Sequence, residues 1–114
     1  MGGENENQLV EFVRTFNPRS SSCLRISEGG KRCSTATVQN SDIGPCGTDH
    51  PQGLGDGIDF SCRDGAIKNN AIIGATDGGI VVFGSPGTLV ENNSIGIVDV
   101  SLLCLIPRDL LKPV

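Results

Sequence analysis

Three short segments of the chain, at residues 24–26, 58–60 and 80–82, each place an apolar residue on either side of a variable one. This alternation predicts β-strands, because successive side chains of a strand point to opposite faces. Ile58 and Phe60 would then face inward and Asp59 outward. If the strands stack, their first residues form one interior ladder and their third residues another. The two ladders would be Leu24, Ile58 and Ile80, and Ile26, Phe60 and Val82.

A second pattern recurs in segments 38–44, 67–72 and 90–96, where an apolar and a polar residue precede an Asn and an Ile follows it. The asparagines Asn40, Asn69 and Asn92 are 29 and 23 residues apart. Ile58 and Ile80 are 22 residues apart, which matches the interval of 23 once one inserted residue near Pro86 is allowed. The two registers agree and predict a repeat. Its asparagines would lie at stacked turns, where side-chain amides can hydrogen-bond along the stack and the backbone can be left-handed.

These repeats predict an all-β fold, a right-handed single-stranded parallel β-helix of about four coils. One coil cannot bury its own apolar face, so the core exists only where coils stack. We expect one domain over residues 1–114, with a cap or first partial coil at 1–21, repeat coils at 22–96 and an apolar tail at 97–114, in a truncated chain. The alternative is chance repetition of Asn-Asn in a glycine-rich β-sandwich.

The N-terminal segment is open to two interpretations. Leu9, Phe12, Val13 and Phe16 have the i, i+3, i+4, i+7 spacing of an amphipathic helix, which could cap the open end of the stack. The same segment, from Val10 to Phe16, could instead be one more coil strand. At the other end, the apolar run 95–106 is expected to close the core as a terminal strand or short helix.

Composition supports β structure and limits the partners. Of 114 residues, 16 are glycine and only 19% are charged, which favours tight turns over long helices. The net charge of −4 argues against a nucleic-acid partner, because phosphate binding needs clustered Lys and Arg. The longest apolar run is shorter than the ~20 residues that cross a bilayer, so no membrane partner is expected.

The chain has five cysteines, Cys23, Cys33, Cys46, Cys62 and Cys104. None lies in a Cys-x-x-Cys pair and there is one histidine, so no metal site is predicted. Disulfides in an oxidising compartment are favoured, and the odd number leaves one thiol unpaired. The first residues lack the basic and apolar regions of a signal peptide, so either the chain is not secreted or its true beginning is missing.

The stretch from Asp56 to Arg63, through Asp77 to Gly84 and on to residues 92–95, resembles the pectin lyase-like superfamily. More narrowly, it is similar to secreted fungal right-handed β-helix repeat proteins, over about residues 22–96. The resemblance implies the fold and an extracellular location. It implies less about chemistry, because that superfamily holds lyases, hydrolases, epimerases and proteins without activity.

Two aspartates are candidate catalytic residues. Asp56 and Asp77 each precede a glycine and a predicted inner strand, 21 residues apart, so successive coils would place them side by side. Paired carboxylates could act as acid and base on a glycosidic bond, or hold calcium if the protein is a lyase. The segment 55–59 is similar to a polygalacturonase motif, but the later acidic and histidine motifs are missing. Alternatively, both carboxylates bond turn amides.

A lyase would use further residues. Arg25 and Asp59 occupy equivalent outward positions, and Arg63 and Lys68 are candidate bases or carboxylate clamps. The alternative for Arg25 and Asp59 is an exposed ion pair worth less than ~1 kcal/mol. The first repeat interval also contains a long loop with Asp49 and His50. Insertions in a solenoid gather on one face, so this loop is the candidate substrate-binding wall, although a lone loop histidine is more often solvated.

Two classes of function remain. The first is an enzyme, a polysaccharide lyase or glycoside hydrolase whose partner is an acidic cell-wall polysaccharide. The second is a catalytically silent β-helix, either a binding or structural module or a fragment of a longer enzyme. Trp and Tyr, the usual sugar-stacking residues, are both absent. Their absence weakens both hypotheses, and a carbohydrate-binding module most.

Overall fold

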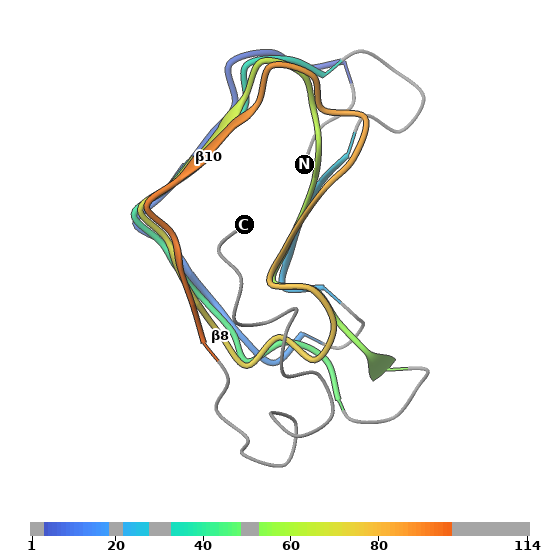
Figure 1. Ribbon diagram of the computed structural model, residues 1–114, viewed down its shortest axis with the longest axis vertical. Coiled ribbons are helices and arrows are strands. Elements are labelled where there is room, and N and C mark those ends of the chain that lie inside the picture. Colours follow the sequence, from blue (N-terminus) through green and yellow to red (C-terminus); the bar gives the residue numbers. More distant parts are fainter. Residues whose placement is uncertain (1–3, 19–21, 28–32, 49–52, 97–114) are drawn as a thin grey trace.

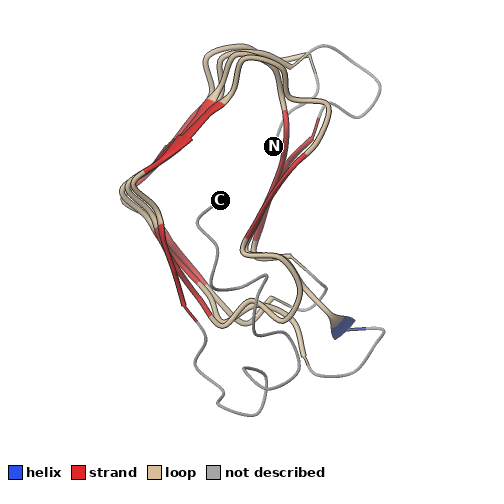
Figure 2. Ribbon diagram, in the orientation of Figure 1, coloured by secondary structure: helices blue, strands red, loops and turns tan. Residues whose placement is uncertain are grey.

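The computed structural model describes residues 4–18, 22–27, 33–48 and 53–96, and in these the fold is all-β with almost no helix (Figure 2). The strands are short, two to four residues each. Their bounds are β1 (Leu9–Glu11), β2 (Arg14–Thr15), β3 (Leu24–Ser27), β4 (Thr37–Gln39), β5 (Asp42–Ile43), β6 (Ile58–Ser61), β7 (Ala66–Lys68), β8 (Ala71–Ile73), β9 (Ile80–Val82), β10 (Leu89–Glu91) and β11 (Ser94–Gly96).

The strands form three parallel sheets, with orders β1-β4-β7-β10, β11-β8-β5-β2 and β3-β6-β9. The chain therefore visits the three sheets in turn. We call one run through them a pass: β1 to β3 is the first, β4 to β6 the second and β7 to β9 the third, after which β10 and β11 return to the first two sheets. Figure 1 shows successive passes following nearly the same path around the interior.

The predicted strand register is confirmed. Leu24 pairs with Ile58 and Ile58 with Ile80, and the triplets continue in the same alignment to Phe60 and Val82. The expected interior position of Val82 is wrong, because Val82 is 39% exposed. Ile58 and Phe60 are fully buried and belong to one hydrophobic core. A parallel ladder on another sheet adds Val10, Val38, Ile67 and Val90 to the interior. The core is thus built from side chains of consecutive passes that lie over one another.

The asparagine turns are confirmed in part. Asn40, Asn69 and Asn92 all have left-handed backbone, with φ of 53°, 59° and 57°. The hydrogen-bonded amide ladder, however, is formed by the next residue of each pass. Asn70 is 2% exposed and its Nδ2 donates to Asn93 Oδ1 at 3.0 Å, and Asn93 Nδ2 donates to the Ile67 carbonyl at 2.9 Å. The first asparagine of each pair has the left-handed backbone of the turn, and the second makes the side-chain hydrogen bonds between passes.

The N-terminal segment is strand, so the capping-helix interpretation is wrong. Val10 is buried in β1 and pairs with Val38 of β4, whereas Phe12 and Phe16 are 77% and 51% exposed. Phe12 has φ of 55°, a left-handed conformation that ends β1 and would break a helix. Pairing with the next pass buries one residue of the segment and satisfies its backbone, whereas a helix would need a separate apolar surface to cover its stripe.

Two disulfides connect described residues, Cys23–Cys46 and Cys33–Cys62. Cys33 and Cys62 lie on neighbouring passes and are fully buried, and the residues after them, Ser34 and Arg63, form a parallel bridge. The disulfides predicted from the cysteine content are therefore present. Cys104 and the apolar run from residue 97 onward lie outside the described residues. No helix in the described part of the chain is long and apolar enough to cross a membrane.

Candidate functional site

A pocket of about 370 Å³ lies against the sheet β3-β6-β9. Its side chains come mostly from the outward positions of the three strands, which alternate with the buried positions of the core. The polar lining residues are Arg25, Ser27, Asp56, Asp59 and Ser61. The apolar lining on the β9 side consists of Val81 and Phe83. The pocket therefore combines charged groups with an apolar wall.

The strand register places the charged groups of this pocket side by side. Arg25 of β3 pairs with Asp59 of β6, which in turn pairs with Val81 of β9. Asp56 lies in the turn that leads into β6, and its carbonyl accepts a hydrogen bond from the Cys23 N–H at 3.0 Å. The next residue, Gly57, allows close approach of the following pass, because a Cβ there would lie 2.5 Å from the Gly79 carbonyl oxygen. The Asp56 turn is therefore fixed from both sides.

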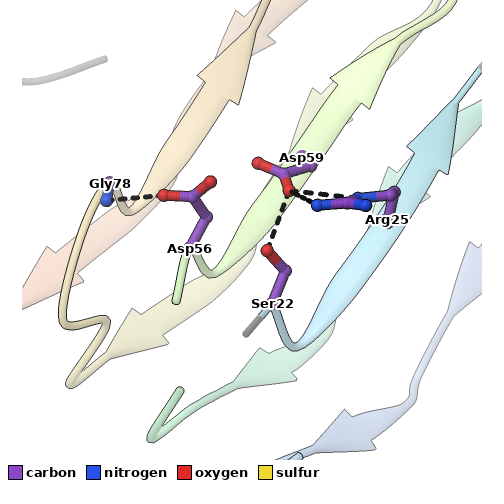
Figure 3. A network of polar contacts seen from close by, with 5 residues as sticks. All are labelled: Ser22, Arg25, Asp56, Asp59 and Gly78. Atoms are coloured by element: carbon purple, nitrogen blue, oxygen red, sulfur yellow. Dashed lines mark hydrogen bonds and ion pairs between the residues drawn. The ribbon is translucent and has the colours of Figure 1, made fainter. Parts of the chain in front are cut away.

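Asp59 is the centre of a polar network (Figure 3). Its Oδ2 accepts hydrogen bonds from Arg25 Nη2 at 3.0 Å, from Arg25 Nε at 3.3 Å and from Ser22 Oγ at 2.8 Å. The Asp59 side chain is only 8% exposed, whereas the Arg25 side chain is 63% exposed. The expected exposed ion pair is thus wrong for one partner: the aspartate is buried, and the guanidinium extends from it into solvent.

Asp56 lies beside this network, in the turn before β6. Its Oδ1 accepts a hydrogen bond from the Gly78 N–H of the following pass at 2.8 Å (Figure 3). Its carboxyl is close enough to that of Asp59 for each group to shift the pKa of the other. The ionisation of the two carboxyl groups is therefore linked.

The two carboxyl groups have pKa values that are moved in opposite directions. Burial raises the pKa of Asp56 from its ordinary value of 3.8 to about 6, helped by the hydrogen bond and charge of Asp59 and by the charge of Asp77, and opposed by the Gly78 N–H. Burial also acts to raise the pKa of Asp59, but hydrogen bonds from Asp56, Ser22 and Arg25 and the charge of Arg25 outweigh it and lower that pKa. Asp56 is the group that holds the proton.

The expected partnership of Asp56 with Asp77 is replaced by one of Asp56 with Asp59. Asp77 is exposed and does not line the pocket, although its charge reaches Asp56. Its backbone N–H donates to the Gly55 carbonyl at 3.0 Å. Successive passes therefore bring the two aspartates near each other, as the spacing predicted, but the carboxyl that affects Asp56 more strongly is that of Asp59 on the strand itself.

Arg63 and Lys68 are not brought to the pocket. Arg63 follows β6 at the corner where the chain leaves this sheet, and Lys68 ends β7 in the neighbouring sheet, paired in register with Gln39 and Glu91. Neither residue is among those that line the pocket. The predicted loop residues Asp49 and His50 lie outside the described residues.

A calcium ion does not fit this group of residues. Calcium is bound by several free carboxylate or carbonyl oxygens, whereas here Asp59 Oδ2 already accepts hydrogen bonds from Arg25 and Ser22, and Asp56 Oδ1 accepts one from Gly78. In the described part of the chain, no set of three His, Cys, Asp or Glu side chains is placed to hold a metal ion. The chemistry of the pocket is therefore derived from its own acid, base and cation.

Phe83 is a pocket residue that was not predicted from the sequence. This side chain is 59% exposed and lines the pocket, one residue beyond β9, where its N–H continues the pairing by donating to the Phe60 carbonyl at 3.2 Å. The alternation contained the signal, because Phe83 lies two residues after the outward Val81. An aromatic ring is thus present beside the charged group, despite the absence of Trp and Tyr.

Comparisons of the chain with protein-family models, with curated proteins and with solved structures give no match. The resemblance to the pectin lyase-like superfamily therefore depends on the sequence motifs alone. Any proposal about function has to be argued from the geometry of the pocket.

Proposed function

We propose that this chain is a right-handed parallel β-helix of the pectin lyase-like type and that it cleaves an acidic polysaccharide by β-elimination. The three parallel sheets visited in turn and the stacked interior ladders support the fold. The two disulfides support an extracellular location, where thiols are oxidised. The observation that carries the function is that Asp56 lines one pocket together with a 63% exposed Arg25, which Asp59 holds in place through an ion pair at 3.0 Å.

The raised pKa suits Asp56 for the role of general base. A carboxylate whose conjugate acid has a pKa of about 6 is ionised at neutral pH, yet is more basic than an ordinary aspartate. In the proposed step it removes the proton from C5 of a uronate unit. The electron pair of that C–H bond forms the C4–C5 double bond, the C4–O glycosidic bond breaks, and the leaving oxygen takes a proton from water.

Arg25 makes that proton easier to remove. A guanidinium binds a carboxylate through a planar set of N–H donors, and neutralising the uronate carboxylate stabilises the negative charge that develops on it. The Arg25 side chain is 63% exposed, so an anion can reach it from solvent. Asp59 positions this guanidinium through the bonds at 3.0 and 3.3 Å, and it keeps the Asp56 pKa high.

The surroundings of Asp59 argue against a hydrolase. Hydrolysis uses two carboxyl groups that both reach the sugar, one as acid and one as base or nucleophile. The Asp59 side chain is only 8% exposed, and its Oδ2 accepts hydrogen bonds from Arg25 and Ser22, so it is not placed to act on a sugar. Elimination needs a single base beside a cation, and the pocket provides both.

Activity on pectate and alginate, with and without calcium, tests the proposal. We expect unsaturated products that absorb in the ultraviolet, with no requirement for added calcium. Asp56→Asn should lower the rate by about 100-fold or more, the usual contribution of a general base. Asp77→Asn is the matched control, an exposed neighbouring aspartate outside the pocket, and should keep most of the rate. Activity that survives Asp56→Asn would contradict the assignment.

A catalytically silent β-helix is the second candidate. It is favoured because the hydrogen bonds in the pocket join residues of neighbouring passes. Asp59 accepts from Ser22 and Arg25 of the preceding pass, and Asp56 accepts from Gly78 of the following pass. Such bonds can simply hold passes together. Neither unsaturated products nor new reducing ends on either polymer would favour this candidate, and new reducing ends alone would indicate hydrolysis.

A further inference from the structure

The pocket is polar at one end and apolar at the other. Arg25 and Ser27 come from β3, the two aspartates lie at the middle strand, and Val81 and Phe83 belong to the β9 side. Neighbouring strands of a sheet are about 4.8 Å apart, so the two ends are separated by about 10 Å. A bound chain that crosses the strands would therefore place different sugar units at the two ends.

The two ends favour different sugar units. At the β3 end, Arg25 is the one cation among the described residues that line the pocket, and it suits one carboxylate. At the β9 end, the ring of Phe83 is 59% exposed and flat, so it can cover the apolar face of a sugar ring. Val81, which lines the pocket on the same strand, has no hydrogen-bonding group in its side chain. This end suits an uncharged unit.

A second carboxylate at the β9 end would be unfavourable. Among the described residues no cation lines that end, and Asp56 and Asp77 lie near it on the adjoining turns. A like charge close to carboxylates in a partly buried site raises the free energy of binding. A polymer made only of uronate units would therefore bind across the pocket more weakly, although it still presents a uronate to Arg25 and Asp56.

We propose that the pocket selects a glycan in which a uronate adjoins a neutral sugar, with the uronate carboxylate on Arg25 and the apolar face of the neutral unit on Phe83. This inference rests on the proposed function for the location of the binding site. It adds a substrate class and a specificity-determining residue, because Phe83 decides which neighbour of the uronate is accepted.

The test is calorimetric titration of the full chain with two tetrasaccharides of equal length, one alternating glucuronate with a neutral hexose and one made only of glucuronate. We expect the alternating tetrasaccharide to bind more tightly. Phe83→Ala should weaken its binding by about fivefold or more while changing the binding of the all-uronate tetrasaccharide little. Ile73→Ala, which removes an exposed apolar side chain on a different sheet, is the control and should change neither.

Equal affinities for the two tetrasaccharides, or unchanged affinities in Phe83→Ala, would overturn the inference, and so would the absence of binding by both. Phe83 is exposed, so its removal is not expected to unfold the chain, and circular dichroism of the variant checks this. Each titration is repeated in the Asp56→Asn background, which removes the proposed base, so that binding is also measured without turnover. Selective binding without cleavage would therefore support this inference and overturn the elimination, whereas cleavage with equal affinities would do the reverse.

Discussion

Asn70 hydrogen-bonds Asn93 of the next pass through both its backbone N–H and its Nδ2, each 3.0 Å from Asn93 Oδ1. Asn70 Nδ2 also donates to the Val38 carbonyl at 3.0 Å, and its Oδ1 accepts from the Ser41 N–H at 3.1 Å. One buried amide thus joins three passes. Because this amide is buried and has partners on both neighbouring passes, it should matter strongly for stability.

Asn70→Ala is expected to lower the free energy of unfolding by about 3 kcal/mol, because it leaves buried backbone groups of Val38 and Ser41 without partners. Urea unfolding followed by circular dichroism measures the loss. Asn93→Ala should cost less, because Asn93 is only partly buried. Equal losses of unfolding free energy in the two variants would show that the burial of the asparagine does not determine its contribution to stability.

The preceding asparagine should behave differently. Asn69 is exposed and has φ of 59°, so its contribution is the tolerance of its backbone for the left-handed conformation. Asn69→Gly should leave stability almost unchanged, whereas Asn69→Ala should cost about 1 kcal/mol. The same unfolding measurement distinguishes them. If Gly destabilises as much as Ala, the side chain rather than the backbone is what the turn requires.

The disulfides should map as Cys23–Cys46 and Cys33–Cys62 in non-reducing peptide analysis. The register requires this pairing, because Ser34 and Arg63, the residues after Cys33 and Cys62, are bridged between neighbouring passes. The double variant Cys33→Ala/Cys62→Ala should lose about 3 kcal/mol of stability. A crossed pairing such as Cys23–Cys33 would contradict the strand register as well as the disulfides.

Much of the fold could be predicted from the sequence, because every pass has to place apolar residues at the same interior positions. An apolar residue that faces the interior must lie over another, so the alternation around Ile58 and Ile80 fixed both the strands and their alignment. The N-terminal segment was ambiguous for a physical reason. Phe12 and Phe16 satisfy a helical spacing, yet pairing with β4 decides the structure, and no spacing within one segment can show which distant strand it will pair with.

The candidate site could be predicted only in part. The spacing of repeats indicated that Asp56 and Asp77 would approach each other, and it placed Arg25 beside Asp59. It could not show that the Asp56 side chain would turn toward Asp59 in its own pass, because that depends on the side-chain direction at a turn. Nor could it show that Asp59 would be buried, since outward residues of a strand are usually exposed.

If Asp56 is the base, the cleavage rate should follow its ionisation. The carboxylate form is the active one, so kcat/KM should be low at pH 4.5, rise with a midpoint near pH 6 and level off above pH 7. Asp77→Asn should move the midpoint to lower pH, because it removes one of the charges that raise the Asp56 pKa. A profile that instead falls as the pH rises through 6 would make Asp56 an acid in the limiting step.

Stability gives a test of the same pKa that does not depend on activity. In the folded chain Asp56 keeps its proton up to about pH 6, whereas in the unfolded chain it releases it near 3.8. The folded state is therefore favoured by this group below pH 3.8, and that contribution is lost as the pH rises through 6.

Asp56→Asn keeps an Oδ1 acceptor for the Gly78 N–H and cannot ionise. It should raise the unfolding free energy at pH 8 by on the order of 1 kcal/mol, after allowance for solvent screening, and change it little at pH 4.5. Asp77→Asn, at an exposed position, should show a much smaller difference between the two pH values. An Asp56→Asn variant that is equally destabilised at both would mean that the carboxyl acts only as a turn acceptor.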